Sequence, residues 1–263
     1  MDSTDGVVRA EPGSVAPGVP PSSAPAPAPA VADLAALRPA TGRLVRTVDG
    51  IDDADWTSPS LLPEWSRAHV VAHLALNAEG LGAAVRGVLE GRRTPMYPSP
   101  EQRDDDIELL ATASPSVLRD RLLGAATELA QALGVLATTP EAHDVLIERT
   151  PGSDRTFTAG SVPGRRLREV EIHHADLGLG YAYAAWPRDF AEGLLERLPA
   201  DAPEPAHLEA VDAGRRWRLG APHDAHPTVR GPLRALAWWA TGRTPAPGDL
   251  TSDSGTLPRM EAM

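Results

Sequence analysis

Apolar residues recur at helical spacing through most of the first two-thirds of the chain, with polar positions between them. This pattern predicts a mainly helical first part. Polar or proline-containing stretches separate the periodic segments, as expected where one helix ends and a loop follows. Helices joined in this way are typical of a four-helix bundle. The expected helices cover about 34–48, 66–88, 99–110, 114–136 and 165–177.

Capping signals mark the starts of three of these helices. Ser66 is placed to cap the second helix, because a serine side chain can accept a hydrogen bond from a backbone N–H of the first turn. The sequence Ser-Pro-Glu-Gln from Ser99 indicates a capping box with proline at the first helical position, and the Ser-Pro pair at Ser114 repeats the signal. Pro39, inside the first helix, is expected to restart or kink it.

The pattern changes from about Trp186 onward, where stretches typical of strands alternate with helical ones. This mixture predicts a small α/β domain after the bundle. The expected fold class is therefore α plus a small α/β domain, a four-helix bundle followed by a small C-terminal α/β domain. The expected elements of that domain are a helix over 190–198, strands over 207–212, 215–219 and 228–230, and a helix over 232–241.

Composition sets the boundaries of these parts. Residues 1–30 are rich in proline and alanine and hold too few large apolar side chains to offset the entropy of ordering, so they are predicted to form a disordered tail. The bundle is expected over 31–183, the α/β domain over 184–250 and a short polar tail over 251–263.

Several classes of function are excluded by what the chain lacks. It contains no cysteine, and all 25 of its basic residues are arginine, so it can use neither a cysteine nucleophile nor a lysine Schiff base. Its net charge of −11 argues against nonspecific nucleic-acid binding and against a basic membrane face. No apolar run approaches the roughly 20 residues that span a bilayer. Asp2 and Asp5 stand where a secretory signal is positively charged, so we expect a cytoplasmic protein with no membrane or nucleic-acid partner.

Two pairs of residues have the spacing of metal ligands. Glu169 and His173 are four residues apart on one expected helix, so their side chains share a face and can hold one ion. His69 and His73 have the same spacing on the second expected helix. A carboxylate and imidazoles from facing helices form a known type of metal site with open coordination positions. Spacing alone does not decide between such a site and surface pairs or hydrogen-bonded core histidines, which are the commoner case.

Three segments also carry a resemblance to a known family. They are LPEWSRAHVVAHLALNAEGL at 62–81, MYPSPEQRDDDIE at 96–108 and RRLREVEIHHADLGLGY at 165–181. In order and spacing they resemble the mycothiol-dependent maleylpyruvate isomerase family, which belongs to the wider DinB-like metalloprotein superfamily. The resemblance extends over about 33–245 and implies a DinB-like bundle.

The resemblance implies specific ligands and cofactors. His73, Glu169 and His173 match the positions that bind a divalent metal in the family, with zinc as the expected ion. Mycothiol is the expected thiol cofactor. His69 would then line the cofactor pocket or support one of the ligands.

Further residues acquire expected roles in the same way. Arg243 matches an arginine near the pocket, where it would contact the thiol cofactor or the substrate and take part in catalysis; a surface arginine that closes a helix is the alternative. Arg103 would face a substrate carboxylate, or else pair with Asp106 or Glu108 on its own helix. Asp176 is spaced to orient a ligand imidazole, or is an ordinary polar residue at a helix end.

The implied reaction is an isomerisation that depends on metal and thiol. A thiolate adds to the cis double bond of maleylpyruvate or a related activated alkene, the resulting single bond rotates, and the thiolate leaves. The absence of cysteine agrees with a borrowed thiol. A mycothiol S-transferase that conjugates the thiol to another electrophile is the alternative, and a non-catalytic protein that keeps the bundle is a further one. The expected partners are a small-molecule substrate and a low-molecular-weight thiol, for a monomer or weak homo-oligomer.

Overall fold

The computed structural model describes Met1 and residues 29–223 and 226–260. The tail predicted over 1–30 therefore lies outside the described residues, apart from Met1 and the two residues at 29 and 30. Those two already belong to the first helix, which begins at Pro29.

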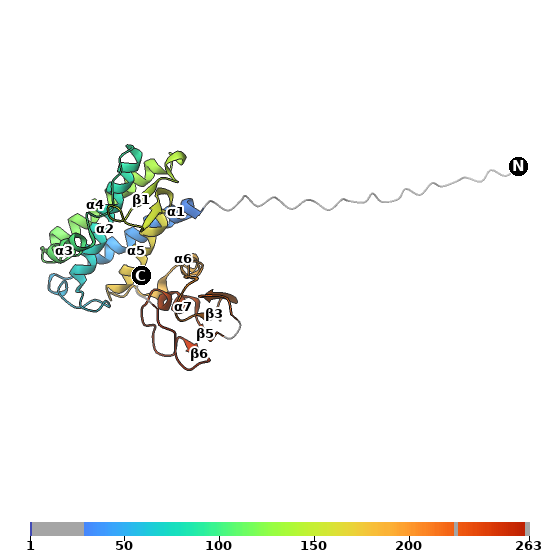
Figure 1. Cartoon of the computed structure of the whole chain (residues 1–263). Helices are drawn as coiled ribbons and strands as arrows, with labels where there is room; N and C mark the ends of the chain where they lie inside the picture. The colour runs from blue at the N-terminus through green and yellow to red at the C-terminus, as the bar shows by residue number, and fades with distance from the viewer. Residues whose placement is uncertain (2–28, 224–225, 261–263) are drawn as a thin grey trace.

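Four long helices form a bundle in the first part of the chain (Figure 1). Helix α1 (Pro29–Asp49) packs against α5 (Val162–Asp176), and α2 (Arg67–Leu89) packs against α4 (Pro115–Leu136). Contacts between α1 and α4 and between α2 and α5 close the ring, while the shorter α3 (Pro100–Ala111) packs against α2. The predicted four-helix bundle is confirmed.

Two of the predicted helix caps are formed by side chains. Ser66 Oγ accepts a hydrogen bond from the His69 backbone N–H (3.4 Å), and His69 Nδ1 accepts one from the Ser66 N–H (3.2 Å), which completes a capping box. Ser99 Oγ accepts from the Gln102 N–H (3.1 Å), but the Gln102 side chain donates to Asp106 (2.8 Å), so the full capping box predicted there is not formed. Ser114 makes no such bond, although proline follows it as expected.

Helix α1 continues through Pro39, so the expected restart of the helix at that residue is wrong. Pro39 is exposed, whereas Ala40 and Leu44 beside it are fully buried. The proline ring therefore faces solvent, and packing of the opposite face of α1 maintains the helix across the missing hydrogen bond.

A short hairpin lies between α4 and α5, where the hydrophobic pattern indicated no element. Strand β1 (Leu146–Glu148) pairs antiparallel with β2 (Thr156–Thr158), and Ile147 stands opposite Phe157. Both of these side chains are buried, so one face of the hairpin packs on the bundle. Strands of three residues are too short for a period of two to be recognised.

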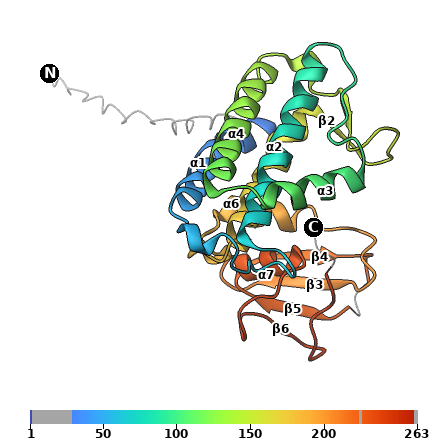
Figure 2. The same ribbon diagram turned by 90° about the vertical axis from the view of Figure 1, so that its left-hand side faces the viewer.

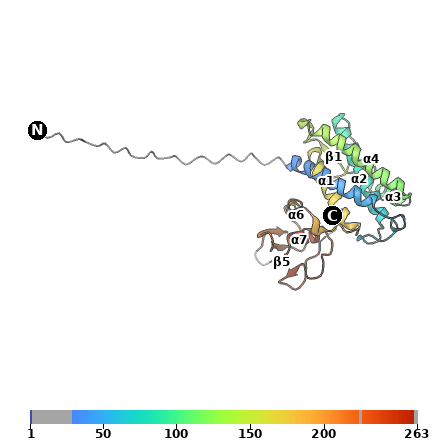
Figure 3. The same ribbon diagram turned by 180° about the vertical axis from the view of Figure 1, so that it is seen from behind.

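The C-terminal part is the predicted small α/β domain. It contains helices α6 (Arg188–Leu195) and α7 (Leu233–Ala240) and a sheet of order β4-β3-β5-β6. The pair β3–β5 is parallel and the other two pairs are antiparallel. Figures 2 and 3 show α6 and α7 between the bundle and the sheet. The strands are β3 (Ala206–Ala210), β4 (Arg215–Leu219), β5 (Thr228–Gly231) and β6 (Thr251–Ser252).

The edge strand β6 lies in the segment for which a polar tail was expected. Its Ser252 pairs with Val229 of β5. Four single turns of 3-10 helix complete the described elements: Asp53–Asp55, Pro140–Ala142, Ala159–Ser161 and Tyr183–Ala185. Within the described ranges, no helix combines the length and the apolar character needed to cross a bilayer.

Trp186 joins the two parts of the molecule. Its side chain is fully buried, and its indole N–H donates to the Glu171 carbonyl oxygen on α5 (3.1 Å). The ring packs edge to face against Phe190 of α6 and Trp238 of α7. One continuous hydrophobic core therefore runs from the bundle into the C-terminal domain. The C-terminal domain is held against α5, the helix that carries two of the candidate metal ligands.

Candidate active site

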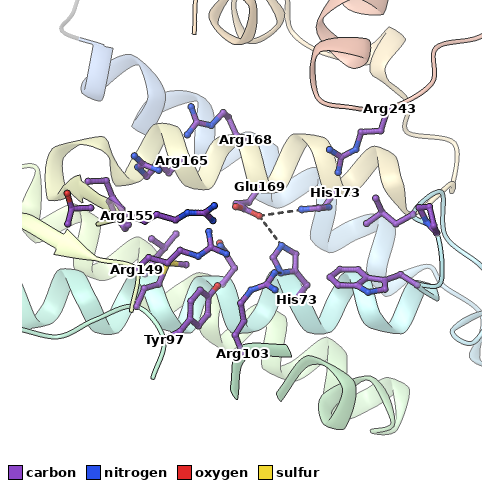
Figure 4. A pocket seen from close by; sticks show the side chains of 18 residues that line it. His73, Tyr97, Arg103, Arg149, Arg155, Arg165, Arg168, Glu169, His173 and Arg243 are labelled. Atoms are coloured by element: carbon purple, nitrogen blue, oxygen red, sulfur yellow. Dashed lines mark hydrogen bonds and ion pairs between the residues drawn. The ribbon is translucent and has the colours of Figure 1, made fainter. Parts of the chain in front are cut away.

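A cavity of about 590 Å³ opens between α2, α3, α5 and the β1–β2 hairpin (Figure 4). Along α2 it runs from Trp65, just before the helix, past His73 to Leu81. Along α5 it runs from Arg165 to His173. The cavity therefore follows two facing helices over about two turns of each, from His73 to Leu81 on α2 and from Arg165 to His173 on α5.

His73, Glu169 and His173 meet in the wall of this cavity. His73 Nε2 lies 2.9 Å from Glu169 Oε2, and His173 Nε2 lies 3.4 Å from the same oxygen. The two imidazole rings stand edge to face with centroids 4.6 Å apart. One ligand atom from each of the three residues lies within 4.8 Å of the others, and among the described residues no other group of three such side chains does so. These three side chains could hold one metal ion.

Packing of the two helices fixes the position of these side chains. His73 stands between Val70 and Leu74, which are fully buried. Asn77, one turn later on α2, accepts a hydrogen bond from Arg166 of α5 (2.7 Å). Arg166 is itself buried, and burial lowers its pKa to about 10, which still leaves it a cation at neutral pH. This contact joins α2 and α5 next to the candidate ligands.

Burial and hydrogen bonding set the protonation of the three residues. Burial lowers the pKa of His73 to about 4, so its ring is neutral at neutral pH. Burial alone would raise the pKa of Glu169, but hydrogen bonds from His173 and His73 hold it well below the usual range. Burial also opposes charging of His173, yet hydrogen bonds to Asp176 and Glu169 raise its pKa overall. An ionised carboxylate and a neutral imidazole are ready to bind a metal, and a metal ion at His173 would replace a proton.

Asp176 connects His173 to the C-terminal domain. Its Oδ2 lies 2.8 Å from His173 Nδ1 and accepts a hydrogen bond from Arg243 Nη2 (2.8 Å), while Arg243 Nε donates to Oδ1 (3.3 Å). Asp176 is fully buried and Arg243 is 8% exposed. Burial would raise the pKa of Asp176, but the hydrogen bonds from His173 and Arg243 lower it. Arg243 thus lines the cavity, and its guanidinium group is paired with the carboxylate that contacts His173.

Arg103 also reaches the ligand group. Its Nη2 lies 3.2 Å from Nδ1 of His73, and its Nη1 donates to Asp104 (2.5 Å). The ion pairs considered from the sequence, with Asp106 or Glu108, are not formed by Arg103 in the described residues. Arg103 therefore faces the cavity, on the side of His73 opposite Glu169 (Figure 4).

The structure places His69 outside the cavity lining. Its Nδ1 serves in the capping box of α2, and its Nε2 lies 3.2 Å from Glu108 on α3. The ring of Trp65 lies near both histidines, with centroids 6.3 Å from His69 and 5.6 Å from His73. One turn of helix therefore separates a histidine used for capping from one that faces the cavity.

Four arginines of the cavity were not identified from the sequence. Together with Arg103 and Arg243 they face a cavity in which Glu169 is the one acidic side chain among the described lining residues. The available signal was the density of arginine over 149–168 in a chain of negative net charge. The four residues are Arg149, Arg155, Arg165 and Arg168.

Comparisons with known proteins place this arrangement in a family. Residues 37–178 match the family described as "Mycothiol maleylpyruvate isomerase N-terminal domain", and residues 185–262 match the "MDMPI C-terminal domain". No curated protein matched the sequence.

Solved structures resemble the chain over most of its length. Crystal structures of the mycothiol-dependent maleylpyruvate isomerase and of a single-residue mutant of it are both similar to it. Each is 28% identical in sequence, covers 90% of this chain and 98% of its own chain, and gives a TM-score of 0.79. YfiT from Bacillus subtilis is less similar, with 18% identity, coverage of 60% of this chain and 89% of its own, and a TM-score of 0.47.

The pair of Arg243 and Asp176 leads to a prediction about stability. Arg243→Ala leaves the Asp176 carboxylate buried without its cation, which should lower the free energy of unfolding by about 3–5 kcal/mol. Arg215 is the matched control, because it also pairs with glutamates in the C-terminal domain but is exposed, and exposed ion pairs contribute little. Urea denaturation measures both variants. Equal stabilities for Arg243→Ala and Arg215→Ala would contradict a structural role for the buried pair.

Proposed function

Since this chain belongs to the mycothiol maleylpyruvate isomerase family, we propose that it is a metal- and mycothiol-dependent cis–trans isomerase of maleylpyruvate or a closely related activated cis-alkene. The observation that carries the proposal is the position of His73, Glu169 and His173 in the wall of an arginine-lined cavity. The donor atoms suit a metal, and the surrounding cations suit a substrate with more than one carboxylate.

We propose His73, Glu169 and His173 as the ligands of a divalent metal, with zinc as the expected ion. Two imidazole nitrogens and one carboxylate oxygen are a common ligand set of catalytic zinc, which keeps a further position open. The hydrogen bond from His173 Nδ1 to Asp176 is the kind of contact that orients a ligand imidazole. Deprotonated Glu169 and neutral His73 also fit this role.

When bound, the metal would stabilise the thiolate form of the thiol. Addition of the thiolate to one carbon of the cis double bond would leave a carbon–carbon single bond that can rotate, and loss of the thiolate would then restore the double bond in the trans form. The chain itself contains no cysteine, which agrees with a thiol supplied from outside. A cytoplasmic location, where thiols are kept reduced, is part of the proposal. The apolar end of the cavity at Leu62 and Trp65 would limit the access of water.

We propose Arg103 as the residue that binds the substrate carboxylate nearest the reacting bond. Its Nη2 now donates toward Nδ1 of His73. When Nε2 of a neutral imidazole is a metal ligand, the proton of that ring must sit on Nδ1, which then cannot accept a hydrogen bond. Arg103 would therefore be released from His73 and become available to an anion in the cavity. Arg243 acts at a distance in this scheme, by holding Asp176 and so positioning His173.

Removal of a proposed ligand should remove the metal. His73→Ala should purify with almost no zinc where the wild type carries about one ion per chain, because two ligands on one helix bind too weakly. His69→Ala, one turn earlier and outside the cavity lining, should keep its zinc and serves as the control. Metal analysis of the purified proteins makes the comparison. A fully loaded His73→Ala protein would disprove the ligand assignment.

Turnover of maleylpyruvate with and without mycothiol tests the reaction. We expect conversion to fumarylpyruvate only when mycothiol is present, with no net consumption of the thiol. Arg103→Ala should lower kcat/KM by roughly tenfold to a hundredfold, the size of one charge-assisted hydrogen bond. Stoichiometric loss of thiol into a stable conjugate would identify an S-transferase instead. Equal rates with and without mycothiol would reject both reactions.

A further inference from the structure

Two arginines face each other at the loop end of the β1–β2 hairpin, one residue beyond each strand. The register that pairs Ile147 with Phe157 places Arg149 opposite Arg155, and the Arg149 N–H donates to the Arg155 carbonyl oxygen (3.0 Å). Alternate residues of a strand share a face, so both arginines lie on the face of the hairpin that carries buried Ile147 and Phe157. That face is turned toward the bundle, and both arginines line the cavity (Figure 4).

A third arginine approaches from the opposite wall. Arg165 lies one turn before Glu169 on α5, so it shares a face with Glu169 and His173. Its guanidinium carbon lies 4.3 Å from the centre of the Phe157 ring on the hairpin. Four residues of helix advance by about 6 Å, which places this arginine about one turn from the ligand group.

These three cations lack the partners that most arginines of this chain have. Within the described ranges, no carboxylate forms an ion pair with Arg149, Arg155 or Arg165, although ion pairs are frequent on the rest of the surface. Like charges directly opposite each other in a hairpin destabilise it. Burial and then the charge of Arg168 lower the pKa of Arg165. Repulsion of this kind is relieved when an anion binds between the cations.

We propose that Arg149, Arg155 and Arg165 form a subsite, the hairpin subsite, which binds the substrate carboxylate remote from the metal ligands. The identity of the substrate rests on the proposed function, whereas the ability of these three arginines to bind a carboxylate does not. An extended dicarboxylate can place one carboxylate near Arg103 and the other at the hairpin subsite. The subsite would therefore select substrates with an anion at both ends over those with one.

Tyr97 supports the separation of the two anion positions. Its ring lies between the two guanidinium groups, 5.8 Å from Arg103 and 5.8 Å from Arg149. Backbone hydrogen bonds fix this segment to the hairpin, from the Met96 N–H to Glu148 O (3.0 Å) and from the Tyr97 N–H to Arg149 O (2.9 Å). The tyrosine ring thus stands next to one arginine of each anion position.

Binding of two acids of equal chain length tests the subsite without catalysis. Adipate carries a carboxylate at each end, and hexanoate carries one. Titration calorimetry on the zinc-loaded wild type should give tighter binding of adipate. The variants are Arg149→Gln, Arg155→Gln and a triple variant that combines both with Arg165→Gln. Removal of the first charge should lower adipate affinity by about tenfold or more and leave hexanoate affinity unchanged.

The control is Arg93→Gln, which removes an exposed arginine that pairs with Glu148 on the same hairpin but does not line the cavity. It should leave adipate affinity unchanged. Melting temperatures separate binding from structure, because loss of like-charge repulsion should leave Arg149→Gln and Arg155→Gln as stable as the wild type or more so. Their KM for maleylpyruvate should rise with little change in kcat.

Each outcome bears on the subsite separately from the reaction. A wild type that does not prefer adipate, unchanged adipate affinity in the triple variant, or equal losses for both acids would overturn the hairpin subsite. Lower melting temperatures of the arginine variants would assign these residues a structural role and overturn it too. If the adipate preference depends on the arginines but maleylpyruvate is not turned over, the subsite stands and the proposed reaction falls. If turnover is normal and KM does not respond, the reaction stands and the subsite falls.

Discussion

The contact of one buried carboxylate with a histidine and an arginine holds the active site and the domain arrangement together. Asp176 is fully buried at the end of α5, where it contacts His173 on its own helix and Arg243 of the C-terminal domain. A carboxylate removed from water is tolerated only when it is paired and hydrogen-bonded. Docking of the C-terminal domain meets that requirement, and the same docking determines how the His173 ring is oriented. Trp186 contributes the apolar part of this interface.

The cavity owes its chemistry to the alignment of α2 with α5. Residues four apart on each helix form a row, so Arg165, Glu169 and His173 stand in line on α5 and face His73 and Asn77 on α2. The row changes from a cationic end to the candidate metal ligands over about two turns. A chain with a net charge of −11 therefore contains a locally positive cavity. This contrast favours a small anion inside the cavity while the outer surface stays negative.

Much of the fold could be predicted because long helices leave strong signals in sequence. Periodic apolar residues marked all five helices of the first part, and the cap at Ser66 was found from one residue type in one position. The proximity of His73 to Glu169 and His173 was expected from spacing together with the family resemblance. His69 has the same spacing to His73 that Glu169 has to His173, yet it caps its helix, because the first turn offers it the Ser66 N–H. Spacing along one helix does not distinguish these roles.

What sequence reasoning missed depends on long-range pairing. Arg149 and Arg155 reach the cavity only because two strands of three residues pair in one register. Nothing local in such short strands specifies that register. The role of Arg243 was likewise hidden, since its partner Asp176 lies far away in the chain.

The dependence of the His173 orientation on Asp176 and Arg243 also has a consequence for folding during synthesis. A ribosome delivers His73, Glu169, His173 and Asp176 before Arg243, which follows Asp176 by 67 residues. Until Arg243 emerges, the Asp176 carboxylate has no cation from the C-terminal domain and resists burial, and the His173 ring lacks its fixed orientation. The bundle on its own therefore positions His173 less firmly than the two parts do together. A fragment that ends before Arg243 would retain His73, Glu169 and His173 but not the contact that fixes the His173 ring through Asp176.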